Sequence, residues 1–166
     1  LIKPDQGDAV IDGASIISNP AEARSKIGFL TSELKLEEFF TPNYLFDFFS
    51  ELHQVPPALR DQRKKILFQR FGIQQFAEVK VANLSTGMKQ RLGLARVLAG
   101  QAELLLMDEP FASLDFLTRE ELQTQLLGIQ QKMPRTIILV THQLDEAVLL
   151  GQKIIVMHSD STVREF

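Results

Sequence analysis

The sequence predicts an α/β fold, in which helices flank a parallel sheet, together with a mostly helical lobe. An unbroken apolar run at residues 104–107 is typical of a strand buried on both faces, and a second run covers residues 136–141. Helical periodicity at residues 118–133 connects these runs, and a short helix at 143–150 leads to a third strand at 153–158. Strands and helices that alternate at this spacing form right-handed crossovers in one parallel sheet.

Composition places the chain among ordinary globular proteins. It has 166 residues, of which 45% are hydrophobic and 23% charged, enough for one domain with a core. The formal net charge of −3 gives no basic footprint, so we expect no nucleic-acid partner. There is no cysteine, which excludes disulfides and thiolate metal sites. The apolar runs are far shorter than the roughly 20 residues of a membrane span. We therefore expect a soluble protein that reaches a membrane only through a partner.

Two short strands are predicted near the beginning of the chain. The first covers residues 9–11 and is followed by a turn at 12–13. The second covers residues 26–30 and ends in the polar stretch 31–33. Residues 1–2 run directly into a turn and look like the tail of an element whose beginning is missing.

Residues 39–81 predict a mostly helical lobe. Thr41 is a suitable N-cap ahead of a proline, and apolar residues recur with helical spacing over 44–52. A second helix is predicted at 60–71, with Gly72 as its C-cap glycine. The aromatic face of the first helix could meet a partner, but its 3.6-residue periodicity favours a packed core. The basic residues of the second helix favour a solvated face.

A sharply defined helix is predicted at residues 83–100. Ser85 can cap its N-terminus, Gly100 ends it, and apolar residues form one stripe between them. A helix N-terminus with free N–H groups is a site for anions. Capping alone, worth roughly 1 kcal/mol, explains Ser85 but not why Thr86 and Gly87 leave that end uncovered. We interpret the helix tip as a candidate anion-binding site.

Chemically distinctive side chains follow the two buried strands. Pro110 cannot donate a ladder hydrogen bond, so the first strand should stop near Asp108 and Glu109. Because His142 follows the second strand, the three side chains should meet at the carboxyl edge of the sheet, where open α/β sheets bind ligands. Adjacent acids repel one another unless a cation or a reacting proton occupies the site. Taken singly, each residue has an alternative, as a solvated acid or as a histidine with a satisfied hydrogen bond.

Four motifs follow one another in a fixed order. They are LSTGMKQR at 84–91, LLLMDEP at 104–110, FASLD at 111–115 and VTHQLDEA at 140–147. In that order they resemble the signature (usually written LSGGQ), Walker B, D-loop and switch-histidine motifs of the nucleotide-binding subunit of ATP-binding cassette (ABC) transporters. KPDQGDAVIDG, at residues 3–13, resembles the piece that follows the phosphate-loop helix of that family. The likeness covers nearly the whole chain, and four ordered motifs are far more specific than any one alone.

The resemblance implies a P-loop NTPase-like parallel sheet with flanking helices and a mostly helical signature subdomain. Residues 1–38 would be a remnant of the N-terminal lobe, 39–100 the helical subdomain with the signature helix, and 101–166 the C-terminal part of the ATPase core. No GxxxxGK[ST] phosphate loop occurs in the sequence. In the family, the strand that precedes this loop lies between the strands corresponding to 136–141 and 153–158. We therefore expect a sheet that is incomplete at the N-terminus and exposes apolar edges, which favour aggregation.

The resemblance also implies roles for single residues. Asp108 would hold Mg²⁺ through water, and Glu109 would orient or deprotonate the attacking water. His142 would contact the γ-phosphate of ATP and link it to Glu109. Asp115 would bridge the two subunits of a head-to-tail dimer. The resemblance implies that the signature residues contact the ATP of the opposite subunit, with a hydroxyl from Ser85 and a backbone amide from Gly87 as donors to the γ-phosphate. The signature residues are Leu84, Ser85, Thr86, Gly87 and Met88.

Three departures from the family pattern bear on activity. Thr86 and Met88 depart from the usual signature, and the usual glutamine after the second strand is replaced by Thr31 and Ser32. Without a phosphate loop, the chain alone is not expected to hydrolyse ATP.

We expect an ATP-binding and ATP-hydrolysing subunit of an ABC transporter, represented by its C-terminal portion. It would power transport through transmembrane permease subunits, together with a second nucleotide-binding subunit, and would lie in the cytoplasm at the inner face of the membrane. The alternative is a non-catalytic cassette-like module that binds and regulates a complete ABC subunit. An ABC-like ATPase acting on DNA or in translation is less consistent with the charge.

Overall fold

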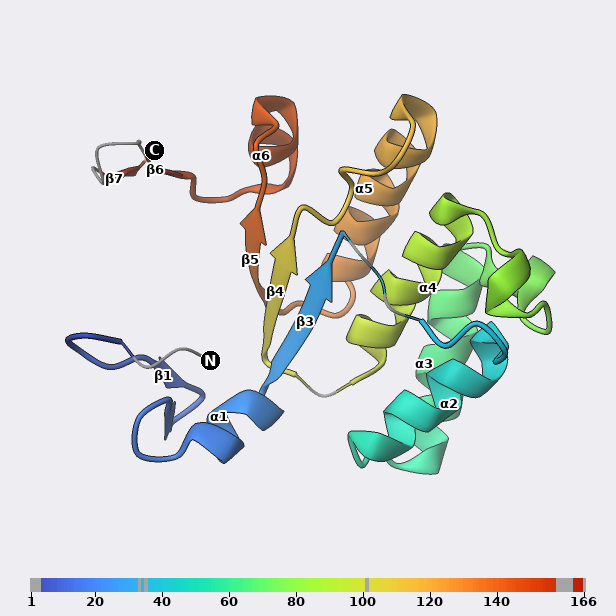
Figure 1. Ribbon diagram of the computed structural model, residues 1–166, viewed down its shortest axis with the longest axis horizontal. Helices are drawn as coiled ribbons and strands as arrows, with labels where there is room; N and C mark the ends of the chain where they lie inside the picture. Colours follow the sequence, from blue (N-terminus) through green and yellow to red (C-terminus); the bar gives the residue numbers. More distant parts are fainter. Residues whose placement is uncertain (1–3, 33, 35, 101, 158–162, 166) are drawn as a thin grey trace.

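A three-stranded parallel sheet with the order β3–β4–β5 lies at the centre of the molecule (Figure 1). The computed structural model describes residues 4–32, 34, 36–100, 102–157 and 163–165. The central strands are β3 (Ile27–Thr31), β4 (Leu104–Asp108) and β5 (Thr136–Val140). The predicted parallel α/β sheet is therefore confirmed, as is its incompleteness.

The remaining elements are helices and two small antiparallel pairs. The pairs are β1 (Val10–Ile11) with β2 (Ala14–Ser15), and β6 (Ile155–Met157) with β7 (Val163–Glu165). The α-helices are α1 (Pro20–Ser25), α2 (Pro42–Leu52), α3 (Pro57–Arg70), α4 (Thr86–Ala99), α5 (Phe116–Gln130) and α6 (Leu144–Leu150), and the 3-10 turns are η1 (Ile73–Phe76) and η2 (Val81–Asn83). Within the described ranges, no helix is long and apolar enough to cross a membrane.

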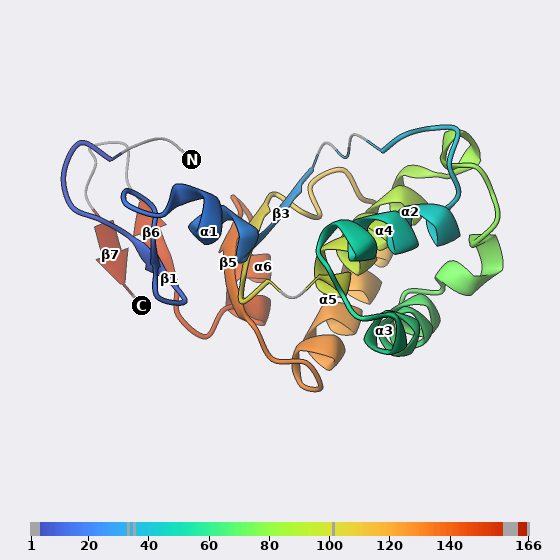
Figure 2. The ribbon, with the colours of Figure 1, turned by 90° about the horizontal axis from the view of Figure 1, so that it is seen from below.

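Only one face of the sheet is well covered. In both ribbon views α4 and α5 lie on one side of the sheet, and β1 and β6 lie on the other (Figures 1 and 2). The side chains that point toward the helices are buried or nearly so, among them Leu30, Leu105 and Met107. Because side chains alternate along a strand, their neighbours point to the opposite face, where Ile138 and Val140 are half exposed. The sheet thus carries an uncovered apolar face.

One strand of the predicted sheet is placed elsewhere. The sequence predicts a third strand of the parallel series at 153–158, but β6 covers only Ile155–Met157 and pairs with β7 instead. Within the described residues, the outer edge of β5 has no neighbouring strand, so nothing connects β6 to the sheet by hydrogen bonds. Residues 1–3, Glu33 and His158, which belong to predicted elements, lie outside the described residues.

The helical lobe packs α2 and α3 against α4. Leu45 and Phe46 of α2 meet Leu67 and Phe68 of α3 in the core, with the Phe46 and Phe68 rings edge to face at 5.3 Å. Leu92 of α4 is also fully buried in this cluster. The core therefore continues from the sheet into the lobe, and α4 belongs to both.

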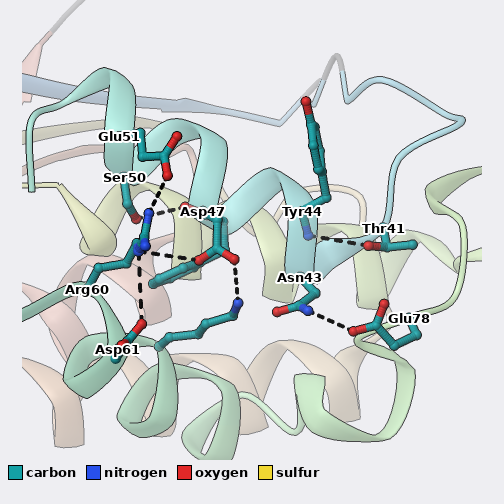
Figure 3. A network of polar contacts seen from close by, with 11 residues as sticks. Thr41, Asn43, Tyr44, Asp47, Ser50, Glu51, Arg60, Asp61 and Glu78 are labelled. Carbon is teal, nitrogen blue, oxygen red and sulfur yellow. Dashed lines mark hydrogen bonds and ion pairs between the residues drawn. The ribbon is translucent and has the colours of Figure 1, made fainter. Parts of the chain in front are cut away.

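Ion pairs between α2 and α3 orient the first helix of the lobe (Figure 3). Lys64 lies 2.8 Å from Asp47, and Arg60 lies 2.5 Å from Glu51. Arg63 donates to the carbonyls of Ala99 and Gly100 at the end of α4. The prediction that the basic residues of this helix form a solvated face is wrong for these three, because each is bound to a neighbouring element.

The aromatic residues of α2 divide into two stripes. Leu45, Phe46 and Phe49 face the core, whereas Tyr44 and Phe48, four residues apart, face outward. The ring of Tyr44 points away from α3 in Figure 3. We call the exposed set the outward row; it consists of Phe39, Tyr44, Phe48 and Leu52. The predicted packed core is therefore wrong for half of the aromatic face, since helical spacing supports two adjacent stripes and α3 and α4 cover only one.

Candidate functional site

The acid pair lies at the end of the central strand. Asp108 is the last residue of β4 and is in register with Val140 on β5. Glu109 follows with a φ of 48°, in the left-handed region, and its amide donates to the Val140 carbonyl at 2.9 Å. This conformation costs a residue other than glycine about 1–2 kcal/mol. β4 thus ends at Asp108, two residues before buried Pro110 and close to the predicted end of the strand.

Glu109 and His142 form the central contact of the site. Oε1 of Glu109 accepts a hydrogen bond from the backbone amide of His142 at 2.9 Å and lies 2.7 Å from its ring Nδ1. Oε2 of the same carboxylate is buried and has no hydrogen-bond partner among the described residues. A buried oxygen without a donor is costly, so this atom is ready for a ligand or a water that can donate to it.

The two side chains differ in their access to solvent. The side chain of Glu109 is 25% exposed and that of His142 is 70% exposed. With Nδ1 turned toward the carboxylate, the other ring nitrogen, Nε2, is available to a ligand, and it donates when the ring is protonated. The pair can therefore accept a proton at one end and hydrogen-bond an anion at the other.

Asp108 is exposed, and the described side chains around it do not form a complete metal site on their own. In the part of the chain that the structure describes, no group of three His, Asp or Glu side chains could hold a metal ion. A cation here would take one carboxylate from this chain and its other ligands from water or a bound phosphate. Mg²⁺ is commonly held in this way, so the residues present fit that ion when it arrives with a phosphorylated ligand.

The signature residues lie at the N-terminus of α4. Ser85 is the N-cap, and its Oγ accepts from the Met88 amide at 3.2 Å, which leaves its O–H free to donate. Ser85 and Thr86 are exposed, and Met88 is partly buried. Leu84 is buried and belongs to the core, so its side chain does not reach a ligand.

Gly87 has a steric reason to lack a side chain. A Cβ at this position would lie 3.1 Å from Cγ2 of Thr118 on α5, tighter than ordinary packing. Close approach of two helix N-termini therefore accounts for this glycine, in addition to leaving the amides of the helix tip uncovered.

Asp115 is the N-cap of α5. Its carboxylate accepts from the Thr118 amide at 3.1 Å, and the hydrogen bond to Thr118 lowers the pKa of Asp115 below its ordinary value. The loop before it is anchored by the buried side chains of Phe111 and Leu114. The Asp115 carboxylate itself is exposed, so a partner could reach it.

Two further residues connect the motifs, and sequence reasoning missed both. Gln90 of α4 is buried and donates through Nε2 to the carbonyl of Pro110. Arg119 of α5 donates to the Leu114 carbonyl at 2.9 Å and to Oε1 of Gln143 at 2.5 Å, so it connects the loop before α5 to the residue after His142. In the sequence Gln90 stands between two charged residues, Lys89 and Arg91, so no local signal marked it as buried.

The fold and this edge of the sheet define a P-loop NTPase-like α/β domain with a helical lobe. Comparison with protein families gives a more specific classification, because the family model described as "ABC transporter" matches residues 1–112. The chain belongs to the ABC transporter family.

Curated relatives are ATP-binding proteins of transport systems. The choline transport ATP-binding protein OpuBA of Bacillus subtilis is 33% identical over 166 residues, which is 99% of this chain and 44% of the relative. The taurine import ATP-binding protein TauB of Roseobacter denitrificans is 36% identical over 95% of this chain and 57% of the relative. The glycine betaine/proline betaine transport system ATP-binding protein ProV of Salmonella typhimurium is 37% identical over 99% of this chain and 42% of the relative. The chain thus spans about half the length of these relatives.

Solved structures show the same architecture. The ATP-binding cassette MJ0796, a dimer in a post-hydrolysis state bound to ADP and phosphate, matches with a TM-score of 0.78 and 25% identity over 99% of this chain and 75% of that one. The structure of cbiO1 from Clostridium perfringens, part of an ABC transporter complex, matches with a TM-score of 0.81 and 25% identity. The match covers 93% of this chain and 63% of that one.

Proposed function

We propose that this chain works as part of the ATP-binding and ATP-hydrolysing subunit of an ABC transporter, which powers transport across a membrane through a transmembrane permease. The observation that carries the proposal is the Glu109–His142 contact, with a buried carboxylate oxygen left without a donor. Family membership and the names of the relatives support it, and several of those names refer to betaine, choline or taurine.

Glu109 is the proposed general base. Its Oε1 is engaged by His142, so the carboxylate cannot rotate freely and Oε2 remains to accept a proton from the attacking water. A well-placed base of this kind contributes typically about 10²–10⁴-fold to the rate.

Asp108 and His142 are proposed to handle the charge of ATP. Mg²⁺, when bound, neutralises phosphate charge in this reaction. Asp108 would hold that ion through water, and Nε2 of His142 would donate to an oxygen of the γ-phosphate. The two residues end neighbouring strands, so both reach one triphosphate group.

The signature residues and Asp115 are proposed to act across a head-to-tail dimer. The O–H of Ser85 and the amide of Gly87 face outward at the tip of α4, where they could donate to the γ-phosphate of ATP held by a second subunit. Thr86 and Met88 would complete that surface, and Leu84 would hold it on the core. Asp115 would contact the second subunit. We place residues 39–100 together as the subdomain that carries this surface.

The outward row is the proposed contact with the permease. Its rings are already ordered, since Phe40 and Tyr44 stack at 4.3 Å and Tyr44 and Phe48 lie 6.2 Å apart. Of the nearby acids, Glu37 and Glu38 precede α2, whereas Asp47 and Glu51 of α2 are ion-paired with Lys64 and Arg60. An anionic membrane surface would be repelled, whereas a permease helix with apolar and basic residues matches both features. The subunit would thereby lie at the inner face of the membrane.

The decisive experiment compares two carboxylates in the full-length protein. Glu109→Gln keeps the size of the side chain but removes its basicity, so ATP hydrolysis should fall at least about 10²-fold. Glu120→Gln, an exposed change on α5, is the control and should leave hydrolysis unchanged. Equal activity of the two variants would overturn the proposal. The 166-residue chain alone should not hydrolyse ATP.

The second candidate is a non-catalytic module that regulates a complete ABC subunit. It is favoured by one observation, the lack of GxxxxGK[ST] in these 166 residues. Adding the chain to a complete subunit should then change that subunit's ATPase rate, and Ser85→Arg should remove the effect. No change on addition would exclude this candidate.

A further inference from the structure

Gln90 connects the signature helix to the turn that carries Glu109. Its side chain is 1% exposed and donates through Nε2 to the carbonyl of Pro110, the residue directly after Glu109. In the described part of the chain, no backbone amide donates to this carbonyl. Among the hydrogen bonds of the described residues, only the one from Gln90 joins this turn to α4.

The turn itself needs such support. Glu109 holds a left-handed φ of 48°, which is unfavourable for a residue with a Cβ. On one side its amide is bound to the Val140 carbonyl of β5. On the other side the carbonyl of Pro110 accepts a hydrogen bond from Gln90. The backbone of the acid is thus held between β5 and α4, and a shift of either element would move it.

The same helix begins at the signature tip. Gln90 lies five residues after Ser85, which corresponds to about 7.5 Å along an α-helix. Ser85 caps the tip, and the intervening segment is one continuous helix. A displacement at the tip would therefore be passed to Gln90 with little loss, because a helix of this length is stiff.

We propose that Gln90 is a positioning residue that couples the tip of α4 to the backbone of Glu109. The inference rests on the proposed function, in which the tip serves the ATP of the second subunit while Glu109 serves the ATP of its own. Gln90 would then relay occupancy of one nucleotide site to the hydrolysing carboxylate of the other.

The first test changes the donor at position 90 in the full-length protein. Gln90→Met keeps length and removes the donor; kcat should fall about 10²-fold, the loss expected from a small misplacement of a catalytic group, while KM for ATP stays within about threefold. Gln90→Glu can donate only while protonated, and burial raises the pKa of the introduced carboxyl. Its kcat should recover toward wild type as the pH falls from 8 to 6.

A matched control separates positioning from stability. Gln123 of α5 is 5% exposed and donates to Glu146 at 2.9 Å, and within the described residues it makes no hydrogen bond to residues 109–111. Gln123→Met should destabilise the protein to a similar extent but leave kcat near wild type. Equal losses of kcat in the two methionine variants, or no recovery of Gln90→Glu at low pH, would overturn the proposal.

Coupling itself is tested by a double-mutant cycle. Ser85→Ala should lower kcat several-fold in the wild-type background and much less in the Gln90→Met background, because the connection is already broken. Purely multiplicative effects would show that Gln90 relays nothing.

A readout independent of activity keeps the two proposals apart. Hydrogen exchange of the Glu109 amide should be faster in Gln90→Met than in wild type or in Gln123→Met. A wild-type protein without ATPase activity would refute the proposed function, yet this measurement would still decide whether Gln90 holds the turn. If exchange at Glu109 is unchanged, the positioning role fails.

Discussion

The carboxylate of Glu109 accepts from both the amide and the ring of His142, at 2.9 and 2.7 Å. The two residues are 33 positions apart and follow different strands, and the parallel register of β4 and β5 brings them together. One oxygen of the carboxylate is thereby occupied and the other is left without a donor. This division is the basis for assigning the two residues different roles.

Removal of the imidazole tests that division. In His142→Ala the ring contact at Oε1 is lost while the backbone contact remains. We expect ATP hydrolysis by the full-length protein to fall about 10²-fold, with Glu109 still in place. Measured by steady-state kinetics, His142→Ala and Glu109→Gln should be far from additive when combined. Full additivity would show that the residues act separately.

The Arg91–Glu121 pair predicts a pH dependence of stability. Arg91 of α4 lies 2.6 Å from Glu121 of α5, and this hydrogen-bonded pairing lowers the pKa of Glu121 from its ordinary value of 4.5. A carboxyl whose pKa is lowered by folding contributes stability above its unfolded pKa and loses it as the pH falls through the folded pKa.

Glu121→Gln should therefore cost more stability at pH 7 than at pH 3. Because the Glu121 side chain is 52% exposed, the expected difference is no more than about 1 kcal/mol. Urea denaturation at both pH values measures it, with Glu120→Gln as the control. A difference that is equal at pH 7 and pH 3 would contradict the assignment.

The uncovered face of the sheet predicts self-association of the 166-residue chain. Ile138→Thr combined with Val140→Thr keeps β-branched residues but makes this face more polar. Light scattering should show less aggregate than for the unmodified chain. Ile137→Thr, on the helix-covered face of the same strand, should instead lower the melting temperature. If both changes act alike, the two faces do not differ as described.

The outward row predicts a separable binding defect. Tyr44→Ser combined with Phe48→Ser should weaken binding to the proposed permease partner at least about tenfold, since exposed aromatic side chains are frequent hot spots. Leu144→Ser, at an exposed residue of α6, is the matched control and should bind normally. Co-purification and thermal melting together distinguish lost binding from lost stability. Normal binding by the double variant would place the permease contact elsewhere.

Much of the fold and the main residues of the candidate site could be predicted because they depend on local signals. The apolar run before Asp108 and the one before His142 identify two adjacent strands, and parallel register then places their ends together. Ser85 was predicted to cap its helix and is the N-cap of α4 in the structure. These inferences needed only hydrophobic periodicity and the chemistry of residues at the ends of strands and helices. Asp115, the N-cap of α5, was singled out only through the family resemblance and not as a helix start.

The rest depends on which elements meet, and periodicity does not contain that information. Nothing in the sequence indicates that α3 covers Phe46 but leaves Tyr44 exposed, or that Arg63 reaches the end of α4. The pairing of β6 was mispredicted for the same reason, since a strand requires a neighbour as well as a pattern. Gln90 was missed because its partner is a backbone carbonyl. Every residue carries such a group, so the sequence does not indicate which one a buried side chain will bind.

The left-handed backbone at Glu109 puts folding stability and the proposed catalytic carboxylate in conflict at a single position. Glycine adopts this conformation without a steric penalty, so Glu109→Gly would relieve about 1–2 kcal/mol while deleting the carboxylate. A library screened only for heat resistance would drift toward glycine at position 109, whereas one screened for the proposed ATP hydrolysis would retain the acid.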